Sequence, residues 1–199
     1  MRSRLPIALA LVALAGQPAA VQQHDHPAGE RLGTVHFETS CSPAVRDKFD
    51  RAVAMLHSFW YAAAIDTFTD VAKTDPSCAM AHWGLAMSHW GNPLGGTRTP
   101  AVMSRGLGVV DTAKKTGNPT PREREYIAAV EKLYANADTL DHPTRALAYE
   151  RAMEAIVAKY PNDTEASIFY AVALDAAASP TDQTYAKQLK AAGLLEKAF

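Results

Sequence analysis

Apolar residues recur at three- and four-residue steps from Pro43 onward, which is the spacing of one face of an α-helix. Ser42 and Pro43 form a typical helix start, because a serine hydroxyl caps free amides and proline is tolerated at the first helical position. We therefore predict a first helix that carries one apolar face, made by Phe49, Ala52, Val53, Leu56 and Phe59.

Helix start and stop signals then repeat along the chain. A second helix is expected over 62–73, since Asp75-Pro76 stops it. The run Thr120-Pro121-Arg122-Glu123 is a capping box, in which threonine and glutamate satisfy each other's backbone amides. No stretch alternates at period two, so the chain is predicted to be all-α. The other expected helices are 78–90, 100–115, 120–134, 141–160, 164–178 and one that follows Ser179-Pro180.

The stop signals are themselves periodic. Pro76, Pro119 and Pro161 each end the second helix of a pair, and their separations are 43 and 42 residues. A helical hairpin repeated at a fixed period is typical of an α-solenoid, in which each hairpin buries its apolar face on its neighbours. The pattern therefore predicts stacked helical hairpins.

Composition agrees with helices and excludes several classes of protein. Among 199 residues there are 38 alanines but only 5 isoleucines and 12 valines, which favours helix over sheet. With 11 glycines and 2 cysteines, the chain is neither collagen-like nor disulfide-dense. Its 20 basic and 21 acidic residues leave a net charge of −1 and form no basic block, so no nucleic-acid partner is expected.

The N-terminus has the organisation of a signal peptide. Arg2 and Arg4 precede an apolar run from Leu5 to Ala15, which is shorter than the roughly 20 residues that a membrane span needs. We predict a signal peptide over 1–20 and a leader segment over 21–42. The protein is then exported to the periplasm or beyond, and no membrane anchor is expected after signal cleavage because no lipoprotein cysteine follows.

The segment from Ala62 to Trp90 resembles a tetratricopeptide-repeat (TPR) junction. Ala64, Phe68 and Pro76 have the alanine, aromatic and proline spacing of that repeat, and Leu85-Ala86 occupy its leucine and small-residue sites. The resemblance implies a right-handed α-solenoid of about four TPR-like hairpins. Repeats two and three exceed the usual period of about 34 residues, and we expect the surplus between their paired helices. The implied repeats are 43–76, 77–119, 120–161 and 162–199, the last incomplete.

A narrower resemblance concerns residues 35–68 and 75–88, which are similar to a bacterial group of exported TPR proteins. Members of that group continue with further helices and histidine-containing motifs. This chain ends LLEKAF, inside an apolar helical pattern and without a cap. We therefore expect it to be a fragment of a longer protein.

Cys41 and Cys78 are expected to form a disulfide. Export places them in an oxidising compartment, and their spacing excludes a CxxC redox motif. In a solenoid the first helices of successive hairpins run side by side, which brings the two cysteines together. The alternative is two unrelated buried thiols.

Histidines are the candidates for metal chemistry. His82 and His89 share one face of a predicted helix but lie about 10 Å apart by helical rise, too far to share one metal directly. His57 ends the adjacent first helix and can approach one of them. His24 and His26 flank Asp25 in the leader, a weak Cu or Zn motif. A histidine-lined groove with Trp60, Trp83 and Trp90 is one interpretation, and packing between repeats is the simpler one.

The chain carries no GxSxG, HExxH, Walker loop or GxGxxG motif, so we predict neither an enzyme nor a bound cofactor, unless residues beyond its C-terminus add a site. Its helical carboxylates are expected on solvated faces: Asp66, Asp70, Glu123, Glu125, Glu131 and Glu150.

The sequence favours an exported scaffold that binds a protein or peptide on the concave face of the solenoid. This expectation rests on repeat architecture. The residues expected at that face are Arg51, Met55, His82 and His89. The alternative is a metal-handling (Cu or Zn) or redox-associated envelope protein that uses His57, His82, His89 and the leader motif.

Overall fold

The computed structural model of the chain describes residues 32–198. No strand occurs within this range, which confirms the all-α prediction. The predicted signal peptide and the motif at His24 and His26 lie outside the described residues. After a 3-10 turn, η1 (Pro43–Val45), the helices are α1 Arg46–His57, α2 Tyr61–Thr74, α3 Ala79–Trp90, α4 Pro100–Lys115, α5 Pro121–Tyr134, α6 His142–Lys159, α7 Thr164–Ala176 and α8 Ala186–Ala198.

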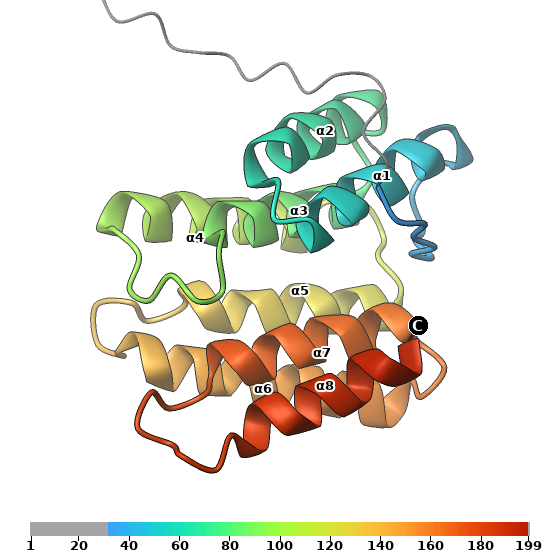
Figure 1. Ribbon diagram of the computed structural model, residues 1–199. Helices are drawn as coiled ribbons and strands as arrows, with labels where there is room; N and C mark the ends of the chain where they lie inside the picture. Colours follow the sequence, from blue (N-terminus) through green and yellow to red (C-terminus); the bar gives the residue numbers. More distant parts are fainter. Residues whose placement is uncertain (1–31, 199) are drawn as a thin grey trace, which may run out of the picture. The chain divides into compact units, whose positions relative to one another are not determined.

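Successive helices pack antiparallel to one another, so that α1/α2, α3/α4, α5/α6 and α7/α8 form hairpins in chain order (Figure 1). Further contacts join α1 to α3 and α3 to α5, the first helices of consecutive hairpins. None of the helices described between residues 32 and 198 combines the length and the apolar character needed to cross a membrane.

Side-chain caps start several helices where the sequence predicts them. The Thr120 hydroxyl accepts from the Glu123 amide at 3.2 Å, and the Glu123 carboxylate accepts from the Thr120 amide at 2.6 Å, which completes the capping box. Thr99, Asp141 and Asp163 cap α4, α6 and α7 through their own side chains. Each cap satisfies amides that a first helical turn leaves free, so local sequence fixes these starts.

Two predicted boundaries differ from the structure. Phe59, which is expected on the apolar face of the first helix, lies beyond the end of α1 at His57, because its backbone is left-handed with a φ of 59°. The eighth helix begins at Ala186 and not directly after Pro180, because the Asp182 carboxylate accepts from the Thr184 amide at 2.9 Å. Such a local side-chain bond competes with helix formation.

The extra length of the second and third hairpins lies partly between their paired helices, as predicted, and partly in longer second helices, since α4 has 16 residues and α6 has 18 whereas α2 has 14. The α1–α2 connection covers only 58–60, whereas 91–99 joins α3 to α4 and 135–141 joins α5 to α6. Each long connection is held by one arginine. Arg98 donates to the carbonyls of Trp90, Asn92 and Gly96, and Arg145 donates to those of Leu133 and Leu140. Each arginine therefore donates to one carbonyl at the end of the preceding helix and to carbonyls within the connection.

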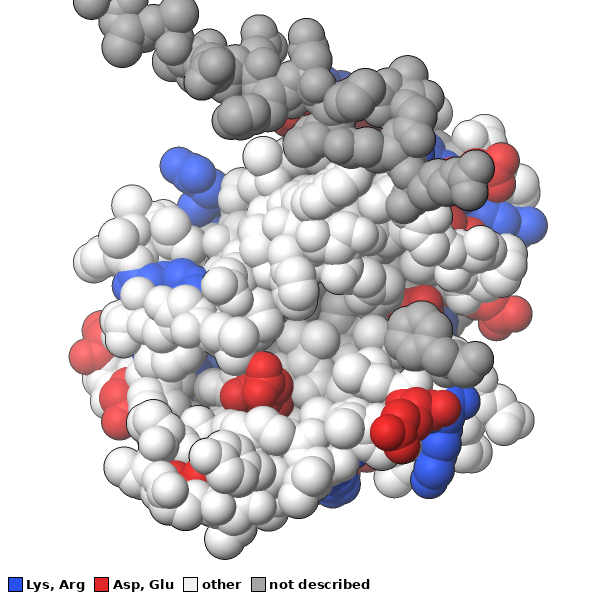
Figure 2. Space-filling model, viewed as in Figure 1, with Lys and Arg blue, Asp and Glu red and all other residues white. Residues whose placement is uncertain are grey.

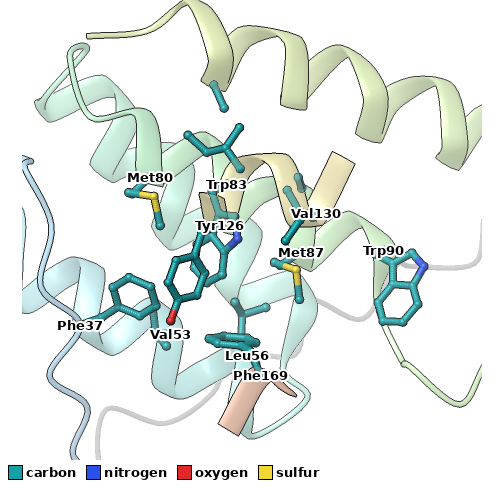
Figure 3. Packing of buried hydrophobic residues seen from close by; sticks show 14 of the residues in the cluster. Phe37, Val53, Leu56, Met80, Trp83, Met87, Trp90, Tyr126, Val130 and Phe169 are labelled. Atoms are coloured by element: carbon teal, nitrogen blue, oxygen red, sulfur yellow. The ribbon is translucent and has the colours of Figure 1, made fainter. Parts of the chain in front are cut away.

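The core lies between the hairpins and is rich in aromatic residues. Trp83, Trp90 and Tyr126 are buried, as the packing interpretation of the tryptophans requires (Figure 3). Glycine permits the closest helix contacts, because a Cβ on Gly84 would lie 2.4 Å from the Phe68 ring. Small residues at these positions thus set how closely the hairpins approach.

Candidate ligand-binding surface

The first helices of the four hairpins present side chains toward one another, and we call this the inner surface of α1, α3, α5 and α7. The Trp83 ring of α3 lies 5.6 Å from the Tyr126 ring of α5 and 5.1 Å from the Phe169 ring of α7. His57 of α1 contacts Phe169 as well, with ring centroids 5.1 Å apart. Side chains from all four hairpins therefore meet around Trp83 and Phe169.

Part of the inner surface is covered by the chain itself. Residues 32–42, which we call the N-terminal strap, have no regular secondary structure and precede η1. Phe37 of the strap is only 2% exposed. Its ring lies 5.7 Å from Phe49, 5.2 Å from Trp83 and 5.2 Å from Tyr126 (Figure 3). The C-terminal part of the expected leader is thus packed into the helical core.

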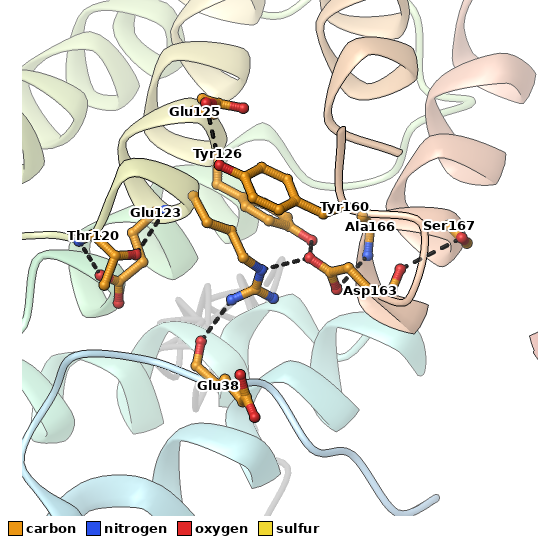
Figure 4. Close-up of polar contacts among 10 residues, drawn as sticks. Glu38, Thr120, Glu123, Glu125, Tyr126, Tyr160, Asp163, Ala166 and Ser167 are labelled. Carbon is orange, nitrogen blue, oxygen red and sulfur yellow. Dashed lines mark hydrogen bonds and ion pairs between the residues drawn. The ribbon is translucent and has the colours of Figure 1, made fainter. Parts of the chain in front are cut away.

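Polar contacts hold the strap backbone in place. The Phe37 amide donates to Asp50 Oδ1 at 3.0 Å. Arg122 donates to the Glu38 carbonyl at 2.8 Å and pairs with Asp163 at 2.6 Å (Figure 4). Its guanidinium also lies 4.8 Å from the Phe37 ring centroid. The helices therefore recognise both an aromatic side chain and the main chain of an extended segment.

Glu123 is the deepest polar anchor of the strap. Its carboxylate accepts from the Ser40 amide and the Ser40 hydroxyl, both at 2.7 Å, and from the Thr120 amide. Glu123 is completely buried, and Glu150 is buried beside Lys187. The expectation that these two carboxylates lie on solvated faces is therefore wrong. Glu123 is hydrogen-bonded across 83 residues of sequence, which helical periodicity alone does not reveal.

A disulfide closes the strap at its C-terminal end. Cys41 and Cys78 are joined, with their Cα atoms 4.7 Å apart, which confirms the predicted pairing. Asp75 lies beside them and accepts from the Ser42 amide at 2.7 Å and the Ser77 amide at 3.0 Å. These hydrogen bonds, led by the one from Ser42, hold the pKa of Asp75 below its ordinary value.

Among the described residues, one group of three side chains could in principle hold a metal ion, and this group contains none of the predicted histidines. Cys41, Asp75 and Cys78 have ligand atoms within 4.8 Å of one another. Both sulfurs are consumed by the disulfide, which leaves a single carboxylate, so these residues do not fit a metal site in the oxidised protein. Within residues 32–198, His57, His82 and His89 do not form such a group.

Beside the strap, the described residues leave part of the inner surface uncovered. We call this space, with a volume of about 340 Å³, the inner cavity. Its volume lies in the range of pockets that enclose small ligands, about 300–1,000 Å³. Strap residues 33–35 form part of the wall, and the rest comes mainly from α1, α3 and α7. The lining residues are Gly33, Thr34, Val35, Ala54, Leu56, His57, Ser58, Phe59, Tyr61, Met87, Trp90, Gly91, Pro93, Glu165, Ile168, Phe169, Val172 and Leu195.

One polar pair interrupts this apolar wall. His57 Nε2 lies 2.8 Å from Glu165 Oε2, and the Glu165 side chain is only 7% exposed whereas that of His57 is 22% exposed. His57 ends α1 and Glu165 lies in the first turn of α7, where the helix N-terminus favours a carboxylate. The pair joins the first and last hairpins across 108 residues of sequence.

Phe59 gives the cavity an unusual edge. It is 59% exposed although it is a large apolar residue, and its φ of 59° is a strained conformation for an aromatic residue. Its ring lies 6.2 Å from that of Tyr61. Burial raises the pKa of Tyr61 to about 12, so its hydroxyl is neutral near pH 7.

The predicted binding residues lie elsewhere. Arg51 is exposed, and Met55 is buried with its sulfur 3.5 Å from the Thr67 hydroxyl of α2. His82 and His89 are half-buried on α3, and burial lowers the pKa of both, with the charge of Arg105 adding to the effect at His89. None of the four lines the inner cavity, whereas His57 does.

Sequence reasoning missed Glu165 and the strap. Glu165 follows the Asp163 cap in an ordinary position for an acidic residue in a first helical turn, so the pattern gives no sign of its burial.

In the view of Figure 2, charged side chains are scattered among wide uncharged areas and form no single basic patch.

Comparisons with known proteins add no identity. No family model, no curated protein and no solved structure matches the chain.

Proposed function

We propose that this protein is an exported TPR-like scaffold, a right-handed solenoid of helical hairpins. In this proposal its inner surface binds an extended segment of a protein partner, and the chain catalyses no reaction of its own. The signal-like N-terminus and the Cys41–Cys78 disulfide, which suits an oxidising compartment, support the exported location.

The strap is the observation that carries the proposal. An extended segment already lies on this surface, with its Phe37 ring between aromatic side chains and its main chain bound by Asp50, Glu123 and Arg122. Recognition of a main chain together with one anchoring side chain is how folded domains commonly bind peptides. The same surface continues into the inner cavity, where a partner segment can lie without displacing the strap.

Peptide selection tests this function. A random ten-residue display library is selected against the mature protein, residues 21–199, and the dissociation constants of enriched peptides are measured by fluorescence anisotropy. We expect micromolar binding that Val172→Arg weakens at least tenfold, because an unpaired charge would then occupy the apolar wall.

Lys132→Glu is the matched control, since Lys132 is exposed on α5 and is not a lining residue of the inner cavity. Circular dichroism of both variants verifies that they fold. Failure to enrich any peptide, or equal loss of binding in both variants, would contradict the proposal.

A further inference from the structure

The charge of the inner cavity is one-sided. Among the described residues that line it, Glu165 is the one acidic residue, and there is neither lysine nor arginine. Arg98 lies close by, over the Trp90 ring at 5.1 Å, but its guanidinium donates to three backbone carbonyls and is not part of the wall. A ligand in this space therefore meets a carboxylate without a fixed positive charge beside it.

Burial strengthens the attraction between the Glu165 carboxylate and a cation. The Glu165 side chain is 7% exposed, so little water screens its charge. Its partner His57 is more exposed than Glu165 and contacts it through one carboxylate oxygen, Oε2. Unlike lysine or arginine, a histidine partner is not a permanent cation, so the pair leaves room for a second cation at the carboxylate.

Aromatic side chains complete the environment. Phe59, Tyr61 and Phe169 line the same cavity as Glu165. The negative face of an aromatic ring attracts an ammonium group, and rings combined with a carboxylate are a suitable environment for organic cations. The molecule uses this chemistry itself, since Arg98 lies over Trp90 and Arg122 over Phe37.

We propose that the inner cavity binds a small organic cation, an ammonium group carried on an apolar body. The apolar body contacts the walls formed by Leu56, Ile168 and Val172, and the ammonium group lies at Glu165. A carboxylate ligand is repelled by Glu165, and a neutral one gains only the apolar contacts. The cavity is shared with the proposed peptide site, but this inference does not require that function, because a small ligand needs only the cavity and no partner protein.

Three probes of one shape test the proposal: 2-(1-naphthyl)ethylammonium, 2-(1-naphthyl)ethanol and 1-naphthaleneacetate. Isothermal titration calorimetry with the mature protein measures each dissociation constant at pH 7.5. We expect the ammonium to bind at least tenfold more tightly than the alcohol, and the acetate to bind most weakly. Equal affinities, or tighter binding of the acetate, would overturn the proposal with the unmodified protein alone.

Two variants assign the site. Glu165→Gln keeps the side-chain shape and removes the charge, so the preference for the ammonium over the alcohol should fall to about onefold. Glu131→Gln is the control, because Glu131 pairs with Lys114 and is not a lining residue of the cavity. If the preference survives Glu165→Gln, the carboxylate does not hold the cation and the proposal fails.

His57→Gln separates the two members of the pair and covers the case in which Glu165→Gln does not fold. It removes the imidazole that competes for Glu165, so ammonium binding should be retained or become tighter. Loss of binding in a folded His57→Gln protein would mean that histidine, and not the carboxylate, holds the ligand, which would also refute the proposal.

Discussion

The inner surface has two parts with similar chemistry and different occupants. Under the strap, the buried carboxylate of Glu123 accepts hydrogen bonds from Ser40, and the Phe37 ring of the strap contacts the Trp83 and Tyr126 rings. At the inner cavity, the buried carboxylate of Glu165 is paired with His57, and the rings around it face open space. The same combination of a carboxylate and aromatic rings therefore stabilises the fold in one part and remains accessible in the other.

The difference teaches that burial by itself does not separate structural from ligand-binding residues. Glu123 and Glu165 are both buried on first helices, and each lies in the first turn of its helix. The difference between them lies in the strap. It supplies the Phe37 ring and the Ser40 hydrogen-bond donors on the Glu123 side, and it supplies no such groups at Glu165 among the described contacts. The following experiments either sharpen this contrast or break it.

The largest effect is expected for the residue that fills the strap side. Phe37→Ala removes a buried ring and leaves a cavity among Phe49, Trp83 and Tyr126, so it should lower the free energy of unfolding by about 3–5 kcal/mol. Urea denaturation measures this. The control Val35→Ala, at a half-buried strap position, should cost clearly less; equal costs would mean that Phe37 is not the anchor.

Removal of the disulfide is next in size. The paired variant Cys41→Ala/Cys78→Ala opens a link across 37 residues, which should cost about 3–4 kcal/mol through the entropy gained by the unfolded chain. Thermal unfolding compares it with the oxidised protein. Reduction of the wild type should give a similar loss, and a variant as stable as the oxidised protein would show that the strap is held by its other contacts alone.

The two buried carboxylates provide the direct comparison. Glu123→Gln weakens charge-assisted bonds from Ser40 and Thr120 and should cost about 2 kcal/mol. Glu165→Gln should cost less, because among the described residues its carboxylate makes one hydrogen bond, to His57, whereas that of Glu123 accepts three. Denaturant unfolding of both variants side by side measures the difference, and the reverse order would place the structural role in the cavity.

The smallest effect is a pH dependence within the strap region. The lowered pKa of Asp75, caused first by the Ser42 amide, stabilises the fold above the ordinary aspartate value of 3.8, and this contribution is lost as pH falls through the folded pKa. Burial raises the pKa of Asp50, so its protonation acts in the opposite direction.

Asp75→Asn should therefore lose stability at pH 7 and show a shallower decline between pH 5 and pH 2 than the wild type. Asp50→Asn should steepen the decline over the same range, because the proton uptake that favours the folded state is removed. Guanidinium titrations at several pH values measure both slopes, and parallel curves for all three proteins would contradict this assignment.

Much of the fold was accessible from sequence, because its signals are local. The apolar spacing from Phe49 to Leu56, the Thr120 capping box and the proline stops each act within a few residues, and each predicts an element that the structure contains. The Cys41–Cys78 pair needed one further step, since it followed from the expected side-by-side arrangement of hairpins. The left-handed backbone of Phe59 and the start of α8 at Ala186 were not predicted. Positive backbone angles and side-chain turns have little effect on the hydropathy pattern from which helix boundaries are predicted.

The candidate site was mostly inaccessible, because its contacts are long-range. Glu165 reaches His57 across 108 residues, and Ser40 reaches Glu123 across 83. Phe37 stands in a short segment without helical periodicity, where a single aromatic residue does not indicate burial. Helical phase assigns a face only within one helix. It predicts a concave-face position for Arg51, Met55, His82 and His89 but cannot show which residues of distant helices meet them.

The sequence by itself determined the helices, their pairing order and the residues that start and stop them, because these depend on backbone propensity and amphipathic spacing within each element. Only the tertiary structure decided which surface is filled by the strap and which remains open. That outcome depends on where Phe37 and Glu165 meet partners from distant hairpins, and the free energy of such contacts is set by burial and distance in space.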